Sequence, residues 1–277
     1  MSDSNDPGVT PVGVNPVGVK PVGAIPFAVP PAFAIHRDVL PQAEVERVRG
    51  FVTRVLGDRP APEPGANDHD WSARFNDLVA GGVLEGPGQL LNFVRKSGVP
   101  DLCRAILGPD VVYSLAKSLV RDFDPARRSQ PAHMHFDAHL FGPQYPMLTV
   151  WVPLNAVGTE SPGLSIATRP NWPAPLWDDL VAAVDAQGVY DADRLRRRGY
   201  RHEEVYALAA REAEWPFIAP ELDVGDVMIF DHQHIHGTQI DIAAPARRMS
   251  LEIRVVSVPT AKSLYTLGRA YSFGRLD

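Results

Sequence analysis

Two side chains that can bind a metal lie two residues apart near the middle of the chain. His135 and Asp137 belong to the run P-A-H-M-H-F-D-A at residues 131–138. The alternation of this run predicts a strand, on which residues two apart point to the same face. The imidazole and the carboxylate would then be directed at one point. Because a chain with nine histidines contains an H-x-D by chance, a metal site needs a further ligand elsewhere.

Three candidates for that ligand follow much later. Residues 225–238 read G-D-V-M-I-F-D-H-Q-H-I-H-G-T and include His232, His234 and His236. On a regular strand all three histidines would face one side, so each could reach the metal. Two neutral imidazoles and one carboxylate on one face of an octahedron leave three positions open, which suits non-haem Fe(II) with a bidentate co-substrate and O2. Zinc usually takes a tetrahedral site with one open position.

Two adjacent arginines complete the set of residues that could do chemistry. Arg247 and Arg248 follow the histidines across a turn that contains Asp241 and Pro245. A planar guanidinium can hold the far carboxylate of a dicarboxylate through two charge-assisted hydrogen bonds. Neighbouring strand residues face opposite sides, so only one of the two arginines can point inward on a regular strand.

Together these motifs resemble the phytanoyl-CoA dioxygenase family of Fe(II)/2-oxoglutarate-dependent oxygenases. The resemblance spans roughly residues 30–258. Its motifs are H-F-D at 135–137, M-L-T-V-W-V-P-L at 147–154, G-D-V-M-I-F-D at 225–231 and H-G-T at 236–238, with the arginines after it. The resemblance implies a mainly β (α+β) fold with flanking helices, a double-stranded β-helix of the jelly-roll or cupin-like barrel type.

The resemblance also implies a ligand set and an activity. His135, Asp137 and His236 would hold Fe(II), because His236 directly precedes Gly237 and Thr238 as in the family. With 2-oxoglutarate and O2 as co-substrates, the enzyme would hydroxylate a C–H bond of a small molecule and release succinate and CO2. Related halogenases lack the carboxylate ligand, so Asp137 disfavours halogenation.

Co-substrate residues follow from the same resemblance. Arg247 stands at the family's usual distance from the distal histidine, whereas Arg248 and Ser250 form R-M-S, which resembles the R-x-S of other 2-oxoglutarate enzymes. We favour Arg247. Thr238 would lie beside the co-substrate carboxylate, and Trp151 would line its pocket.

The elements that must position these residues are mostly short alternating strands separated by turn residues. This pattern is typical of an antiparallel sandwich or barrel. Expected strands cover residues 33–36, 111–121, 134–139, 148–154, 164–167, 226–230, 234–240 and 249–258, and expected helices cover 41–57, 72–79 and 89–106. Arg121, on the predicted strand 111–121, could meet a substrate carboxylate or pair with Asp122 or Asp124.

Residues outside the folded core form an arm and an insertion. Residues 1–31 repeat Pro-Val-Gly and predict a flexible arm before a domain at 32–277. A helical insertion is expected at about 169–214. Its arginines between Arg194 and Arg201 could form an anionic-substrate lid or a solvated helix face.

Composition narrows the class of partner. The chain has 277 residues, a net charge of −6 and a single cysteine, Cys103. We therefore expect a cytoplasmic protein with a small-molecule partner, without nucleic-acid or membrane binding, while its oligomeric state is open. The alternatives to the oxygenase are a catalytically silent binding or regulatory module and a cupin-like metal enzyme that needs no 2-oxoglutarate.

Overall fold

The computed structural model describes residues 33–57, 72–82, 88–124, 135–141, 145–167, 217–242, 246–266 and 273–276. The expected arm at residues 1–31 and the expected insertion at about 169–214, with its arginine cluster, lie outside these ranges. Both therefore stay predictions.

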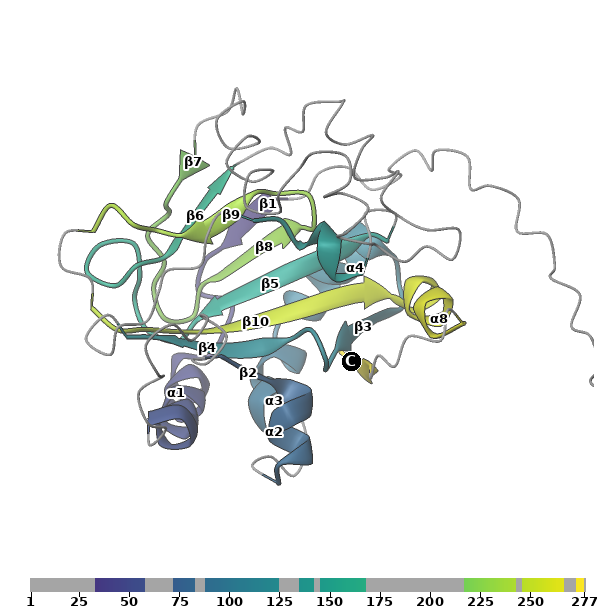
Figure 1. Ribbon diagram of the computed structural model, residues 1–277, viewed down its shortest axis with the longest axis horizontal. Coiled ribbons are helices and arrows are strands. Elements are labelled where there is room, and N and C mark those ends of the chain that lie inside the picture. Colours follow the sequence, from purple (N-terminus) through teal and green to yellow (C-terminus); the bar gives the residue numbers. More distant parts are fainter. Residues whose placement is uncertain are drawn as a thin grey trace, which may run out of the picture.

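A large antiparallel sheet forms the centre of the fold (Figure 1). Its strands run in the order β1-β8-β5-β10-β3-β11, while β4 pairs with β10 and β2 pairs with β4. Their bounds are β1 Phe33–His36, β2 Ser72–Arg74, β3 Val111–Ser114, β4 Leu119–Phe123, β5 Met147–Pro153, β8 Val227–Asp231, β10 Arg248–Ser257 and β11 Phe273–Arg275. β10 pairs with β5 on one side and with β4 and then β3 on the other.

A smaller antiparallel sheet faces one side of the large one. It consists of β7 (Phe217–Ile218), β6 (Leu164–Ala167) and β9 (His236–Thr238), in that order. Buried side chains of both sheets form one apolar cluster, with Trp151, Met228 and Phe230 from the large sheet and Leu164 and Ile166 from the small sheet. We call the side of the large sheet that faces this cluster the inner face.

Helices cover the opposite side of the large sheet. They are α1 (Gln42–Gly57), α2 (Phe75–Ala80), α3 (Gly88–Arg95) and α4 (Val99–Leu107), while α8 (Val258–Thr266) continues from the end of β10 (Figure 1). Val45, Val48 and Val52 recur at helical spacing in α1 and are fully buried against the sheet. None of the described helices is long and apolar enough to cross a membrane.

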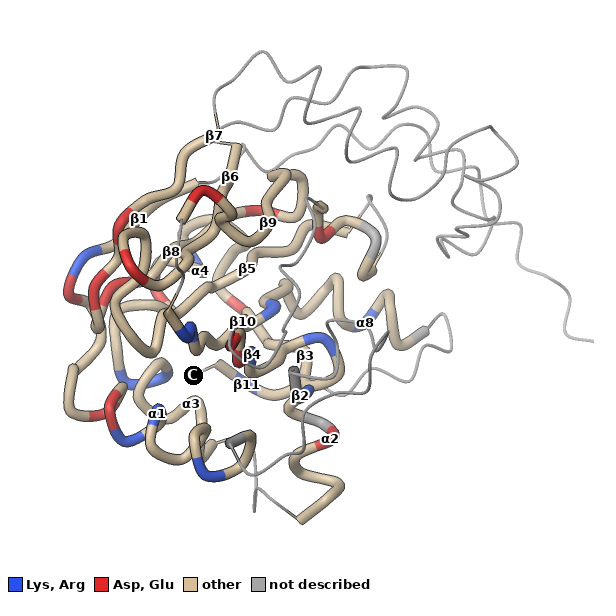
Figure 2. Tube along the Cα trace, turned by 60° about the vertical axis from the view of Figure 1, so that its left-hand side comes forward, with Lys and Arg blue, Asp and Glu red and all other residues tan. Residues whose placement is uncertain are grey.

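β10 has one side in the core beneath the helices and the other on the inner face of the large sheet. Its odd-numbered residues enter the core beneath the helices: Met249, Leu251, Ile253 and Val255. Its even-numbered residues face the inner side instead, and they are polar yet buried: Arg248, Ser250, Glu252 and Arg254. Acidic and basic positions consequently lie close together on β4 and β10 (Figure 2). Buried charges of this kind need partners, so the inner face is where a functional site is expected.

Most expected elements are confirmed. The strands at 33–36 and 164–167 have the predicted bounds, and those expected at 148–154, 226–230 and 249–258 are displaced by one residue. β5, β8 and β10 are recognisable from the sequence because their apolar residues are buried on both faces of the sheet.

Besides the strand expected at 134–139, four expected elements need correction. The strand expected at 111–121 is two strands, because the Ser118 amide donates to the Ser114 carbonyl at 2.9 Å and closes a turn. The helix expected at 89–106 is two helices, because the chain turns at Ser97, whose hydroxyl donates to the Val94 carbonyl at 2.7 Å and accepts from the Val99 amide at 3.2 Å. Residues 72–79 begin as β2 before α2, and the strand expected at 234–240 shortens to β9.

A glycine is required where the loop after β5 meets the loop before β8. Gly158 has φ +105°, and a Cβ there would lie 2.6 Å from the Glu221 Cα. Gly158→Ala should lower the free energy of unfolding by about 2 kcal/mol or more in a denaturant titration.

Gly50 is the matched control, since it is an exposed position of α1 where a Cβ would meet nothing within 4 Å. Gly50→Ala should raise the free energy of unfolding by up to about 1 kcal/mol. Equal stabilities for the two variants would show that the turn at Gly158 tolerates a side chain.

Candidate metal centre

Backbone pairing brings the two separate histidine motifs together. His135 and His236 form an antiparallel bridge in which each amide donates to the other residue's carbonyl at 2.8 Å. Their ring centroids are 4.3 Å apart. Asp137 joins them, and one ligand atom from each of the three residues lies within 4.8 Å of the others. The three residues that the sequence singled out therefore form a group that could hold a metal ion.

Asp137 reaches this group from a turn rather than from a strand. The chain is extended at Phe136, and Asp137 then begins a 3-10 helix that ends at Leu140. The Ala138 amide donates to the His232 carbonyl at 2.9 Å, which bends the chain away from the bridge. The strand expected at 134–139 is therefore wrong from Asp137 onward, although the convergence that it predicted is present.

The carboxylate of Asp137 is buried and held on both oxygens. Thr149 donates to Oδ2 at 2.5 Å, and Arg254 donates from Nη2 to Oδ1 at 3.2 Å. Arg254 Nε also lies 3.1 Å from Oδ2. Burial alone would raise the pKa of Asp137, but Arg254, both histidines and the Thr149 hydrogen bond together hold this pKa well below its usual range. Asp137 is thus an ionised candidate ligand at neutral pH.

His236 is oriented by a second backbone contact. Its Nδ1 lies 3.0 Å from the His234 carbonyl, which can only accept, so Nδ1 carries the proton and Nε2 presents a lone pair. Nε2 lies 3.9 Å from Asp137 Oδ2. Burial lowers the pKa of His236 while the Asp137 charge opposes this effect. A neutral imidazole with a fixed tautomer is the form that binds metals.

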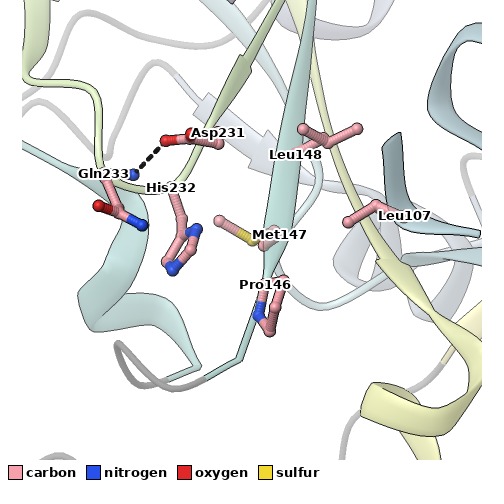
Figure 3. A pocket seen from close by; sticks show the side chains of 7 residues that line it. All are labelled: Leu107, Pro146, Met147, Leu148, Asp231, His232 and Gln233. Carbon is pink, nitrogen blue, oxygen red and sulfur yellow. Dashed lines mark hydrogen bonds between the residues drawn. The ribbon is translucent and has the colours of Figure 1, made fainter. Parts of the chain in front are cut away.

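The other two histidines of the run face different surroundings. The chain turns after β8, where the Gln233 amide donates to Asp231 Oδ1 at 2.8 Å, and this turn breaks the alternation. His234 is fully buried, with Nδ1 2.9 Å from Asp231 Oδ1. His232 lines a small hollow beside Met147 (Figure 3). Of the three histidines that the sequence left open, only His236 joins the group.

Arg247 and Arg248 point to opposite sides of the large sheet, because neighbouring residues along a strand face opposite sides. Arg247 engages Asp122 through both ends of its fork, with Nε 2.7 Å from Oδ1 and Nη2 2.6 Å from Oδ2, and this contact raises the pKa of Arg247. Arg248 is 1% exposed and donates from Nη1 to the Gly163 carbonyl at 3.2 Å. The preference for Arg247 stays a prediction, although its guanidinium already engages a buried carboxylate.

Arg248 lies at the far end of the same site. Thr238 follows His236 by two residues on β9 and pairs with Leu164, the neighbour of the carbonyl that Arg248 contacts. Residues two apart on a strand share a face, so Thr238 lies on the side of the metal ligand. Trp151 is fully buried on the inner face.

The sequence analysis did not single out Glu252 and Arg254, which lie close to Asp137, although it did single out Arg121. Arg121, expected to meet a substrate or a neighbouring aspartate, donates from Nε to Glu252 Oε1 at 2.9 Å. Glu252 in turn accepts from Arg254 at 3.0 Å. The alternation of R-M-S-L-E-I-R at 248–254 was a signal that could have identified them, since a buried strand with polar side chains on one face is unusual.

Removal of a ligand tests the metal centre directly. Asp137→Ala and His236→Ala should each weaken Ni(II) binding by about 100-fold or more, measured by calorimetry on metal-free protein. His234→Gln is the matched control, because it alters a buried histidine two residues away yet keeps the carbonyl that orients His236. Equal loss in all three variants would mean that metal binding reports folding rather than this ligand set.

Comparison with known proteins shows that the fold of this chain is similar to several solved structures. No protein-family model and no curated protein sequence matches the chain. The epimerase SnoN, solved with Fe3+, alpha ketoglutarate and nogalamycin RO, has a TM-score of 0.53 at 14% identity, over 82% of this chain and 79% of SnoN. EctD from S. alaskensis, solved with 2-oxoglutarate and 5-hydroxyectoine, has a TM-score of 0.50 at 17% identity, over 83% and 73% of the two chains.

A third similar structure is AviO1 from Streptomyces viridochromogenes Tue57, with a TM-score of 0.50 at 14% identity, over 83% of this chain and 91% of AviO1. At such identities the likeness concerns the fold. The chain therefore shares the mainly antiparallel fold of non-haem iron and 2-oxoglutarate-dependent enzymes, and it carries a His-Asp-His group that could bind iron.

Proposed function

We propose that the protein is an Fe(II)/2-oxoglutarate-dependent dioxygenase that hydroxylates a C–H bond of a small-molecule substrate and releases succinate and CO2. The convergence of His135, Asp137 and His236 carries the proposal. A double-stranded β-helix related to the phytanoyl-CoA dioxygenase family would supply the framework. The similar fold of SnoN and EctD, solved with iron or with the co-substrate, supports this choice of cofactors.

The three residues fit a divalent iron ion. They offer two nitrogen donors and one ionised carboxylate, the set that leaves several positions open on an octahedral ion. Iron held there would supply O2 activation coupled to decarboxylation of 2-oxoglutarate. The chain's own part is to keep the ligands deprotonated and fixed, through Thr149 and Arg254 on Asp137 and through the His234 carbonyl on His236.

The inner face also fits a dicarboxylate. Trp151 Nε1 and Ser250 Oγ are buried and have no hydrogen-bond partner among the described residues. Buried polar atoms are nearly always paired, so these two indicate a ligand with acceptor oxygens. Arg248 and Ser250 share the inner face of β10, and Arg248 lies at the Thr238 end of the site. A dicarboxylate that extends from the metal ligands toward Thr238 would meet Arg248, which we propose as its partner in place of Arg247.

Apolar side chains separate this region from water. The centroids of the Phe230 and His236 rings are 4.6 Å apart. Phe230 belongs to the apolar cluster between the two sheets, in which Met228 and Ile166 are also fully buried. A dry cavity strengthens the hydrogen bonds of a guanidinium to a carboxylate and protects an oxidising centre from side reactions.

The two adjacent arginines provide the test of the co-substrate site. Arg248→Ala should raise the KM for 2-oxoglutarate by about 100-fold in an assay of succinate release, because two charge-assisted hydrogen bonds are lost. Arg247→Ala should change this KM by less than about threefold, although it should lower the melting temperature because it leaves buried Asp122 unpaired. The reverse order of KM values would assign Arg247 instead.

The ligand variants test the activity itself. His135→Ala and Asp137→Ala should abolish turnover of 2-oxoglutarate in the absence of substrate, because the iron is no longer held. Undiminished succinate formation in both variants would reject the assignment. Substrate oxidation by the wild-type protein without 2-oxoglutarate would favour a cupin-like metal enzyme.

A further inference from the structure

Arg254 has donors that its protein contacts do not use. Nε and Nη2 face the two oxygens of Asp137, and Nη2 also donates to Glu252 Oε2 at 3.0 Å. The side chain is only 3% exposed, yet Nη1 has no hydrogen-bond partner within the ranges that the structure describes. A guanidinium has five N–H donors and no way to lose its charge, so a buried unused edge indicates an acceptor supplied by a ligand.

The guanidinium is positioned by ion pairs on its other edges, through two hydrogen bonds of Nη2 and the 3.1 Å approach of Nε to Asp137 Oδ2. Arg121 contacts Glu252, Glu252 contacts Arg254, and Arg254 contacts Asp137, so positive and negative groups alternate across the inner face. This arrangement fixes the direction of Nη1 before any ligand arrives. Preorganised donors bind an anion with less loss of side-chain freedom than mobile ones do.

An acceptor of Nη1 would lie beside the metal centre. Nη2 of the same guanidinium touches Asp137, and Thr149, which pairs with Arg254 across the sheet, touches the same carboxylate. Two further unused donors, Trp151 Nε1 and Ser250 Oγ, belong to the next rows of the same face toward Arg248. Unused donors thus extend from the metal ligand to the arginine at the start of β10.

The charges on this face favour a dianion. On the inner face Arg121, Arg248 and Arg254 outnumber Asp137 and Glu252, whereas Asp122 lies on the other side of β4 and is paired with Arg247. A divalent metal would add further positive charge. A ligand with a carboxylate at each end would be stabilised at both ends of the row of donors.

We propose that Arg254 donates from Nη1 to the carboxylate that a bound 2-oxo acid places next to the metal. Two arginines would then divide the carboxylates of 2-oxoglutarate between them, with Arg248 on the far carboxylate and Arg254 on the near one. The inference rests on the proposed function, because it requires a 2-oxo acid at this site. It makes Arg254 a ligand-binding residue in addition to a support for Asp137.

Two ligands that differ only at the far end test this division. 2-Oxopentanoate has the chain of 2-oxoglutarate without the far carboxylate, and Ni(II) loading keeps the complex from turning over. Calorimetry should show that Arg254→Lys weakens both ligands by about tenfold or more, because the near carboxylate is common to them. Arg248→Lys should weaken 2-oxoglutarate alone. Arg247→Lys, on the same strand but paired with Asp122, should leave both affinities unchanged.

Ni(II) affinity is measured first for each variant. If Arg254→Lys also loses the metal, Glu252→Gln replaces it, since this change loosens Arg254 and leaves Asp137 untouched; both ligands should then weaken several-fold. Unchanged affinities for both ligands, or a loss confined to 2-oxoglutarate, would overturn the role of Arg254. Absence of 2-oxoglutarate binding to the Ni(II)-loaded wild-type protein would instead reject the proposed function.

Discussion

The buried negative charge of Asp137 is the constraint on which the site depends. A carboxylate at 1% exposure is costly unless charged or hydrogen-bonding groups surround it, and Arg254 and Thr149 supply both. Arg254 is itself buried and needs Glu252. Burial would raise the pKa of Glu252, but Arg121 and Arg254 lower it to about 2. The charge network around the metal centre follows from the placement of a single carboxylate.

β10 makes this network compatible with a stable fold. One side of the strand packs apolar residues under the helices, and the other side carries arginines and a glutamate into the space between the sheets. Core packing and the candidate site meet at this strand, because its long pairing with β5 and β4 fixes which side each residue takes. A shift of one residue would exchange the two sets and remove both the core and the site.

Two short turns decide which residues join the His-Asp-His group. The bend after β8 removes His232 and His234 from the line of His236 and gives the His234 carbonyl the role of orienting it. The 3-10 turn at Asp137 takes the carboxylate out of the strand and lets it meet Thr149 and Arg254. Such turns depend on backbone hydrogen bonds to distant segments, for instance from Ala138 to His232, that periodicity does not encode.

By itself, the sequence determined the mainly antiparallel class of the fold, most of its buried strands and the identity of the three residues that converge. It did so because hydrophobic alternation and the H-x-D spacing of His135 and Asp137 are local properties, while the resemblance to a known family singled out His236 among three candidate histidines. Only the tertiary structure showed that Arg247 pairs with Asp122 while Arg248 lies on the inner face, since alternation along a strand does not say which face is covered until the sheet is assembled. It also placed Glu252 and Arg254 behind Asp137, because contacts between β10 and a turn far away in the chain arise only when the sheet is assembled.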